Sequence, residues 1–178
     1  MHLKTLIQES SNGKEAAQKL LFHQTSAQLN SVAIRYVVDK SLAQDVLQET
    51  YIRIFKNLKQ FEYVDDNSAL AWMKRIAATE SLRLLKKRKR WNATDNLHSS
   101  DAISDVDAYA TDEIMQALLI LPYRQRLVFN MYVIEGYSHR EIANHLDLAE
   151  SSSRALLTRG RTHLQSIISK KKAYEQVS

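Results

Sequence analysis

Apolar residues recur every three or four positions over most of the chain, the spacing that predicts amphipathic helices. The longest such stretches cover residues 14–38, 41–58, 69–90 and 124–136. Strand-like alternation is scarce, and the chain has one Pro and three Gly, so few positions interrupt a helix. The pattern therefore predicts an all-α protein.

The apolar stripes also predict which residues form the core. In the N-terminal half these are Leu20, Leu21, Leu29, Val32, Ala33, Tyr36, Val46, Leu47, Tyr51, Ile54, Phe55, Leu58, Leu70, Met73, Ile76, Ala77 and Leu84. In the C-terminal half they are Ile114, Leu118, Leu119, Leu121, Leu127, Val128, Met131 and Tyr132. Ser41 with Gln44 predicts a capping box at the start of the second helix, and Asn67 or Ser68 can cap the third.

Residues 138–164 predict two short helices joined by a tight turn. Ser138 and Glu141 fit a capping box, and Asp147 suits the left-handed backbone of a turn. The second helix is expected to turn Ala155 or Leu156, with Leu157 and Leu164, inward. Its short polar and cationic side chains would then be exposed, as in the recognition helix of a helix-turn-helix. An ordinary αα-hairpin with a solvated basic face fits this stretch equally well.

Charge is distributed unevenly along the chain, which carries a formal net charge of +5. Residues 83–90 contain six cations and no acid. Because crowded like charges repel, a polyanion is the natural partner for this segment. A solvated helix end explains only two or three of these cations, and a polybasic patch beside a membrane would need an anchor that the sequence lacks.

No Lys or Arg occurs between Trp91 and Tyr123, whereas several Asp residues do. The segment is poor in bulky apolar residues and predicts a flexible acidic linker. We therefore expect two small helical domains, residues 1–92 and 113–178, joined by a linker over residues 93–112. The C-terminal domain would carry the helix-turn-helix.

Several classes of protein are excluded by what the sequence lacks. There is no Cys, and no Gly-rich phosphate loop, metal-ligand set or nucleophile–base constellation stands out, so we expect neither an enzyme nor a cofactor or metal. No apolar run approaches the length of a membrane span, and the N-terminus is too polar for a signal peptide. The expected location is the cytoplasm.

Three segments resemble parts of bacterial sigma factors. The polymerase-binding helix of that family is similar to LAQDVLQETYIRIFKNLKQF, and its promoter-melting helix is similar to AWMKRIAATESLRLLKKRKR. The family's −35-reading domain resembles LPYRQRLVFNMYVIEGYSHREIANHLDLAESSSRALLTRGRTHL. Their order and the short chain match the extracytoplasmic-function group, the minimal members of the sigma-70 family.

This resemblance implies roles for three sets of residues. The polymerase-binding set is Asp45, Gln48, Glu49 and Arg53, which the residues alone would favour as a solvated face with an i,i+4 ion pair. The −10-binding set is Phe61, Tyr63, Asn67, Trp72, Arg75, Thr79, Arg83, Lys86, Lys87, Arg88, Lys89 and Arg90. The −35-binding set is Ser152, Arg154, Ala155, Thr158, Arg159 and Arg161.

The implied function is promoter-specific transcription initiation. The implied partners are core RNA polymerase, promoter DNA and an anti-sigma factor. Six positions differ from the common family pattern. Asn is frequent where Thr79 stands and Asp where Arg83 stands. In the helix-turn-helix, the family more often has Gly in place of Asp147, Ser or Thr in place of Ala149, Val in place of Ser153 and Arg in place of Leu156. The alternatives are a stand-alone helix-turn-helix regulator, which needs no polymerase-binding face, and a helical regulator that binds RNA or an acidic protein through the basic segment.

Overall fold

The computed structural model describes residues 2–91 and 113–175, and most of these residues are helical, with no strand among them. The all-α prediction is thereby confirmed. The chain divides after Trp91 into two compact units, which are described separately below. The predicted acidic linker, residues 93–112, lies outside the described part of the chain.

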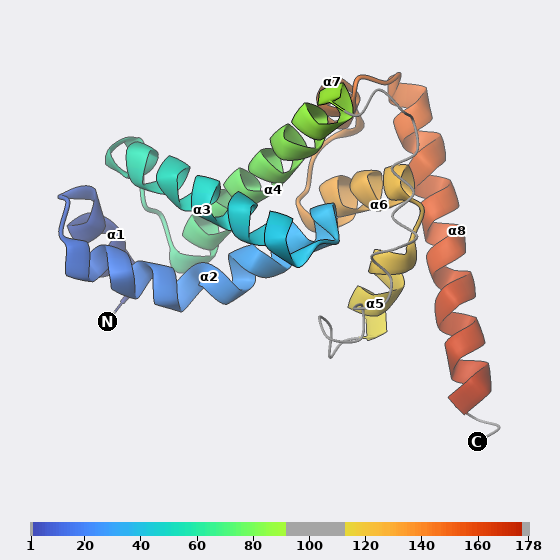
Figure 1. The fold of residues 1–178 in the computed structure, drawn as a ribbon, viewed down its shortest axis with the longest axis horizontal. Helices are drawn as coiled ribbons and strands as arrows, with labels where there is room; N and C mark the ends of the chain where they lie inside the picture. Colours follow the sequence, from blue (N-terminus) through green and yellow to red (C-terminus); the bar gives the residue numbers. More distant parts are fainter. Residues whose placement is uncertain (1, 92–112, 176–178) are drawn as a thin grey trace. The chain divides into compact units, whose positions relative to one another are not determined.

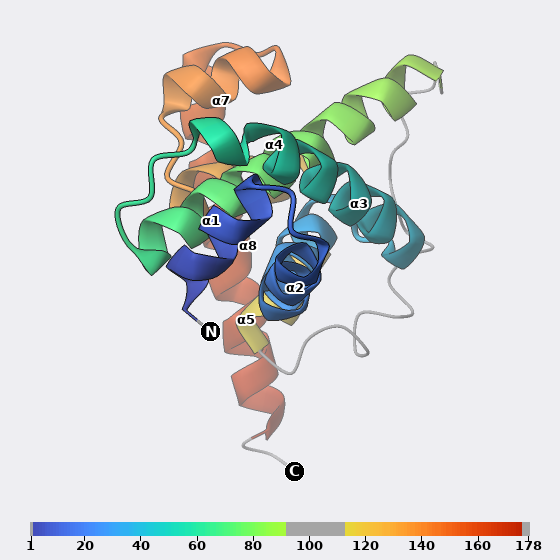
Figure 2. The ribbon, with the colours of Figure 1, turned by 90° about the vertical axis from the view of Figure 1, so that its left-hand side faces the viewer.

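The first unit is organised around α2, which packs against α1, α3 and α4. Its elements are α1 (Leu3–Ser11), α2 (Glu15–Val37), α3 (Lys40–Asn57), the short 3₁₀ helix η1 (Leu58–Gln60) and α4 (Asp66–Trp91) (Figure 1). Figure 2 looks nearly along α2 and shows α1, α3 and α4 on one side of it, above it in this view. Leu21, Leu29, Tyr36, Ile54 and Met73 are fully buried where these helices meet.

The helix boundaries of this unit differ from the predicted ones in identifiable ways. The pattern did not predict α1, which Gly13 separates from α2 in a left-handed conformation (φ 81°). The predicted caps were wrong. Asp39 caps α3 by accepting from the Leu42 amide at 2.9 Å, and the carboxylate of Asp65 accepts from the Ser68 amide at 2.6 Å. Asp therefore supplies both caps, two or more positions before the expected residues.

The predicted core of the first unit was partly wrong. Leu20 is 48% exposed, because the inward face of α2 is centred on Ala17, Leu21 and Thr25. The side chains of Leu47, Phe55, Leu70, Ile76 and Leu84 are only partly buried. In α4 the small residues Ala69, Ala77, Ala78 and Ser81 are fully buried together with Met73, and small side chains at these positions allow α2 and α3 to pack against this helix.

The second unit is organised around α8, which contacts α5, α6 and α7. Its elements are α5 (Glu113–Ile120), α6 (Tyr123–Phe129), the π-helical segment η3 (Asn130–Ile134), α7 (His139–Leu146) and α8 (Glu150–Glu175). Leu118, Leu127, Val128 and Met131 are buried, as expected, and Ile142 of α7 is buried with them.

Two core predictions for the second unit were wrong. Ile114 is 53% exposed near the start of α5. Tyr132 is 37% exposed, since the π-helical turn carries it out of the core, where its ring stacks on His139 at a centroid distance of 4.3 Å. The helix α8 continues to Glu175.

The helix-turn-helix has the predicted local geometry. Ser138 and Glu141 form the complete capping box, and Asp147 ends α7 in the left-handed region (φ 55°). Ser153 lies buried between α7 and α8, where its hydroxyl is 2.9 Å from Nδ1 of His139. Desolvation lowers the pKa of His139, which favours the neutral ring in this contact.

Candidate functional site

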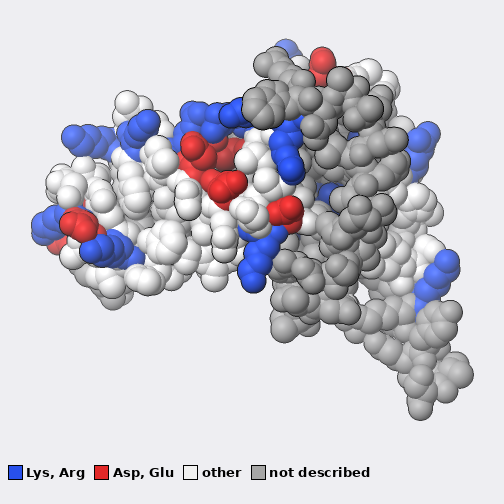
Figure 3. Space-filling model, viewed as in Figure 1, with Lys and Arg blue, Asp and Glu red and all other residues white. Residues whose placement is uncertain are grey.

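The first candidate surface is the exposed side of α3. Asp45, Gln48, Glu49 and Arg53 all lie on it, because Ala43, Val46, Thr50 and Ile54 occupy the inward side. A helix places residues spaced by three or four on one side, so the four predicted polymerase-binding residues form one polar surface. Figure 3 shows acidic and basic side chains next to one another over α3 and α4.

A network of ion pairs connects this surface with α4. Arg53 Nε lies 2.9 Å from one carboxylate oxygen of Glu80, and Arg83 Nε lies 2.6 Å from the other. Arg83 Nη2 is also 3.3 Å from the Glu49 carboxylate. The Glu80 side chain is 3% exposed, so its charge is neutralised inside the unit by the two arginines. Sequence reasoning missed Glu80, since an isolated Glu beside an apolar stripe gives no signal of burial.

Residues 61–67 carry Phe61, Tyr63 and Asn67 of the predicted −10-binding set, and this segment is held in place by its own contacts. The ring of Phe61 stacks on Trp72 at 4.3 Å, and the hydroxyl of Tyr63 donates to the Asp66 carboxylate at 2.5 Å. That hydrogen bond raises the pKa of Tyr63 to about 12. Lys4 Nζ, from the unpredicted helix α1, lies 5.7 Å from the Tyr63 ring centroid. Both aromatic rings are thus present at the predicted place but already have partners.

The predicted −10-binding residues of α4 fall into two groups. Trp72, Arg75 and Thr79 line one pocket of about 340 Å³, together with Arg53, Asn57, Ile76 and Glu80. Arg83 instead lines a pocket of about 430 Å³ with Glu49, Ile52, Arg53, Lys56 and Asn57. Further along α4, Lys86, Lys87 and Arg88 are exposed, while the side chains of Lys89 and Arg90 lie outside the described part.

The second unit presents the predicted −35-binding residues on one exposed surface of α8. All six predicted side chains are exposed, namely Ser152, Arg154, Ala155, Thr158, Arg159 and Arg161. Arg154 pairs with Glu150 one turn earlier at 2.5 Å, and Thr158 donates to the Arg154 carbonyl at 3.1 Å. The expectation that Ala155 or Leu156 faces inward is met by Leu156, which is half-buried.

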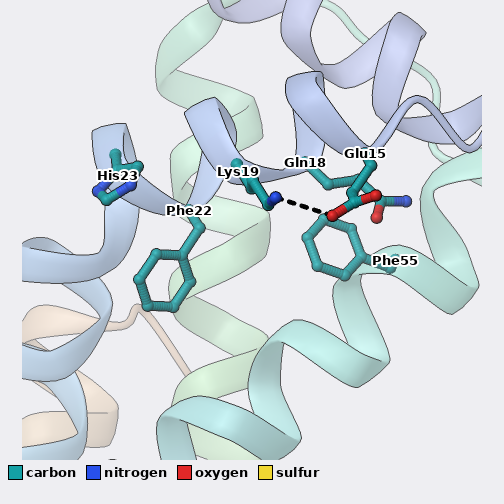
Figure 4. Close-up of a pocket in the computed structure, with 6 residues that line it drawn as sticks. All are labelled: Glu15, Gln18, Lys19, Phe22, His23 and Phe55. Atoms are coloured by element: carbon teal, nitrogen blue, oxygen red, sulfur yellow. Dashed lines mark ion pairs between the residues drawn. The ribbon is translucent and has the colours of Figure 1, made fainter.

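A separate pocket lies between α2 and α3 and contains none of the predicted residues. It has a volume of about 310 Å³ and is lined by Glu15, Gln18, Lys19, Phe22, His23 and Phe55, with Lys19 paired to Glu15 (Figure 4). The residues that line this pocket do not include a nucleophile paired with a general base. The described residues also contain no group of three or more His, Cys, Asp or Glu placed to hold a metal ion. None of the described helices has both the length and the hydropathy of a membrane span.

Comparison with known protein families matches both units. The family model described as Sigma-70 region 2 matches residues 21–91, which include α3, the loop and α4. The model described as Sigma-70, region 4 matches residues 111–164, which include the helix-turn-helix. Together they cover more than two thirds of the chain, in the order expected from the sequence. The chain belongs to the sigma-70 family of RNA polymerase sigma factors.

Curated relatives place it in the extracytoplasmic-function group of that family. The chain is 26% identical over 172 residues to the RNA polymerase sigma-H factor of Pseudomonas aeruginosa, with 88% of each chain covered. It is 24% identical over 174 residues to the ECF RNA polymerase sigma-E factor of Salmonella typhimurium, with 89% of this chain and 90% of the relative covered. A stand-alone helix-turn-helix regulator is not favoured, because the region 2 match would be unexplained.

Two solved structures have a similar fold. One is CnrH in complex with the cytosolic domain of CnrY, with a TM-score of 0.54 and 19% identity over 93% of this chain and 96% of that chain. The other is the sigma factor RpoE of Bartonella quintana in complex with the anti-sigma factor NepR, with a TM-score of 0.51 and 20% identity over 85% of this chain and 96% of that chain. At these identities the likeness shows the fold alone.

Proposed function

We propose that this sigma factor recruits core RNA polymerase through the exposed side of α3 and directs it to a two-part promoter. The supporting observation is that the polymerase-binding set lies on the exposed side of α3 and the −35-binding set on the exposed side of α8, each inside its matched region. Residues 1–92 would form the polymerase- and −10-binding domain, residues 113–178 the −35-binding domain, and residues 93–112 the linker between them.

Promoter opening follows from the chemistry of the loop and α4. Unpaired bases are recognised by stacking and by hydrogen bonds to their edges, which aromatic and amide side chains supply. Phe61, Tyr63, Asn67 and Trp72 provide these groups, and Arg75 and Thr79 extend the surface along α4. The exposed cations that begin at Lys86 would bind phosphates of the adjoining duplex by releasing counterions. No bond is made or broken by this chain, so the protein is proposed to act without catalysis.

The −35 element would be read by α8 in the major groove. Arg159 and Arg154 project from the exposed side of this helix, and an arginine can form two parallel hydrogen bonds to a guanine edge. The chain would act in the cytoplasm, where the polymerase and the promoter are. An anti-sigma protein is the proposed regulator, since the RpoE structure is a complex with the anti-sigma factor NepR and the CnrH structure is a complex with the cytosolic domain of CnrY.

A reconstituted run-off transcription assay tests these assignments, one surface at a time. Replacing Asp45, Gln48 and Glu49 together with Ala is expected to weaken core binding about tenfold or more, the size of effect seen when several interface contacts are removed. Replacing Arg159 with Ala should cost about 1–3 kcal/mol at the cognate −35 sequence if it contacts a base. Core affinity is measured by titration with a labelled sigma factor.

The two outcomes that contradict the proposal are distinct. Unchanged core affinity of the α3 variant would remove α3 as the docking surface. Tight, promoter-specific binding of duplex DNA by the chain alone, with no response to core polymerase, would restore the stand-alone regulator. Lys19→Gln serves as the control, because Lys19 is an exposed cation of α2 that also pairs with a glutamate.

A further inference from the structure

Arg83 was expected to contact DNA, but its surroundings are those of a protein interface. Its guanidinium lies between two carboxylates, Glu80 on the same helix and Glu49 on α3. A DNA phosphate that approached Arg83 would also approach Glu49, which is about half exposed and repels it. By contrast, the exposed cations of α4 that follow Arg83 have no acid among them in the sequence, which suits a polyanion.

The pocket beside Arg83 has the composition of a protein-binding surface. It combines three cations, Arg53, Lys56 and Arg83, with Glu49, the amide of Asn57 and the aliphatic side chain of Ile52. Ile52 is 47% exposed, whereas the apolar residues Val46 and Ile54 of α3 are buried in the core. Arginine and apolar side chains are enriched in protein interfaces, whereas nucleic-acid surfaces are more uniformly basic.

We propose that Arg83 belongs to the polymerase-docking surface and that the buried Glu80 is the positioning residue that holds it there. The surface then extends from Glu49 and Arg53 on α3, across Ile52, to Arg83 on α4. Its occupant is core RNA polymerase, through a segment that brings an acidic side chain to Arg83 and Arg53 beside an apolar one for Ile52. This inference rests on the proposed docking surface of α3.

The position of Glu80 explains how one residue can orient both arginines. Its two carboxylate oxygens bind one arginine each, Arg53 at 2.9 Å and Arg83 at 2.6 Å, and its own side chain is 3% exposed. Each guanidinium is thereby anchored at Nε, and the arginine side chains remain 50% and 54% exposed. Because the anchor is inside the unit and the arginines reach the surface, their geometry is set before the polymerase binds. Pre-organisation of this kind lowers the entropic cost of docking.

The test compares two arginines of the same helix in the full-length chain. Arg83→Gln is expected to lower core polymerase affinity about fivefold or more, the loss typical of an important interface contact. It should leave the preference of the holoenzyme among promoter sequences unchanged. Arg75→Gln, in the pocket of Trp72 and Thr79, should leave core affinity unchanged and instead impair opening of promoter DNA by preformed holoenzyme. Lys19→Gln should change neither measurement.

Glu80→Gln tests the positioning role, since it keeps the side-chain volume and removes the charge. We expect it to lower core affinity about as much as Arg83→Gln, and the double variant to lose little more, because the two residues act as a unit. A lower Tm of Glu80→Gln with unchanged core affinity would reduce Glu80 to a structural role and overturn its part of the proposal.

The outcomes separate this inference from the proposed function. If Arg83→Gln keeps full core affinity but impairs promoter opening at saturating polymerase, Arg83 is a DNA-binding residue and the inference is overturned. In that case the triple variant of Asp45, Gln48 and Glu49 would still weaken core binding. If the triple variant also binds core normally, α3 is not the docking surface and both proposals fail.

Discussion

At the scale of single residues, Arg126 is a charged residue with a structural role in the interior of the second unit. It is 4% exposed, and its Nη1 donates to the carbonyls of Leu119 at 3.1 Å and Leu121 at 3.2 Å. These carbonyls lie at the C-terminal end of α5, where a helix leaves acceptors without partners. Burial lowers the pKa of Arg126 to about 10, which still leaves the guanidinium charged at neutral pH. Arg126 thus connects the end of α5 to α6.

Arg126→Met is expected to destabilise the second unit by about 2 kcal/mol or more, because two buried carbonyls lose a charged donor. The free energy of unfolding, measured by urea denaturation followed by circular dichroism, checks this expectation. Arg124→Met is the matched control, since Arg124 is exposed on the same helix. Equal stability of the two variants would contradict the role assigned to Arg126.

Single residues also differ in how far the sequence alone could predict their place in the candidate site. The common exposed side of Asp45, Gln48, Glu49 and Arg53 was predictable from their spacing along a helix, whereas their polymerase-binding role is implied only by the resemblance. Glu80 and Lys4 were not, since Glu80 acts from inside the unit and Lys4 meets Tyr63 across a long separation in sequence. Charged residues are mostly exposed, so a sequence alone gives no reason to place one in the interior.

At the scale of elements, local start and stop signals decide the helix-turn-helix. The Ser138 hydroxyl accepts from the Glu141 amide at 3.2 Å, and the Ser138 amide donates to the Glu141 carboxylate at 2.8 Å. These contacts fix where α7 begins, and the left-handed Asp147 fixes where it ends. The boundaries of α7 therefore depend on residues close in sequence, which is why they were predictable.

Ser138→Ala is expected to cost about 1 kcal/mol, the usual effect of losing a serine cap. The loss should appear as a lower Tm for the second unit and as faster amide exchange in the first turn of α7. Ser166→Ala, at an exposed position within α8, should be neutral or slightly stabilising, because Ala favours the helix interior. Equal Tm values of Ser138→Ala and the unmodified chain would show that the capping box does not stabilise α7.

At the scale of the whole molecule, the chain contains two units with separate cores. Leu21, Leu29 and Met73 belong to the first, and Val128 and Met131 to the second. Each unit has its own central helix, α2 in one and α8 in the other. We infer that each core stabilises its own unit, so that damage to one leaves the other folded.

Leu29→Ala and Met131→Ala test this independence in the full chain. Each removes a fully buried side chain and should cost about 2–5 kcal/mol. Hydrogen exchange is expected to show lost protection in α2 to α4 for the first variant and in α6 to α8 for the second. Loss of protection in both units from either single substitution would mean that they unfold as one.

The sequence by itself determined the helical class, the division into two units, the capping box of α7 and the exposed surfaces of α3 and α8. These follow from periodicity, charge and local caps, which act over a few residues. Only the tertiary structure decided the docking of α1 beside the loop, the exposure of Leu20 and Tyr132, and the burial of Glu80 between two arginines. Such features depend on which helices pack together. The apolar periodicity of one helix does not show which other helix will pack against it.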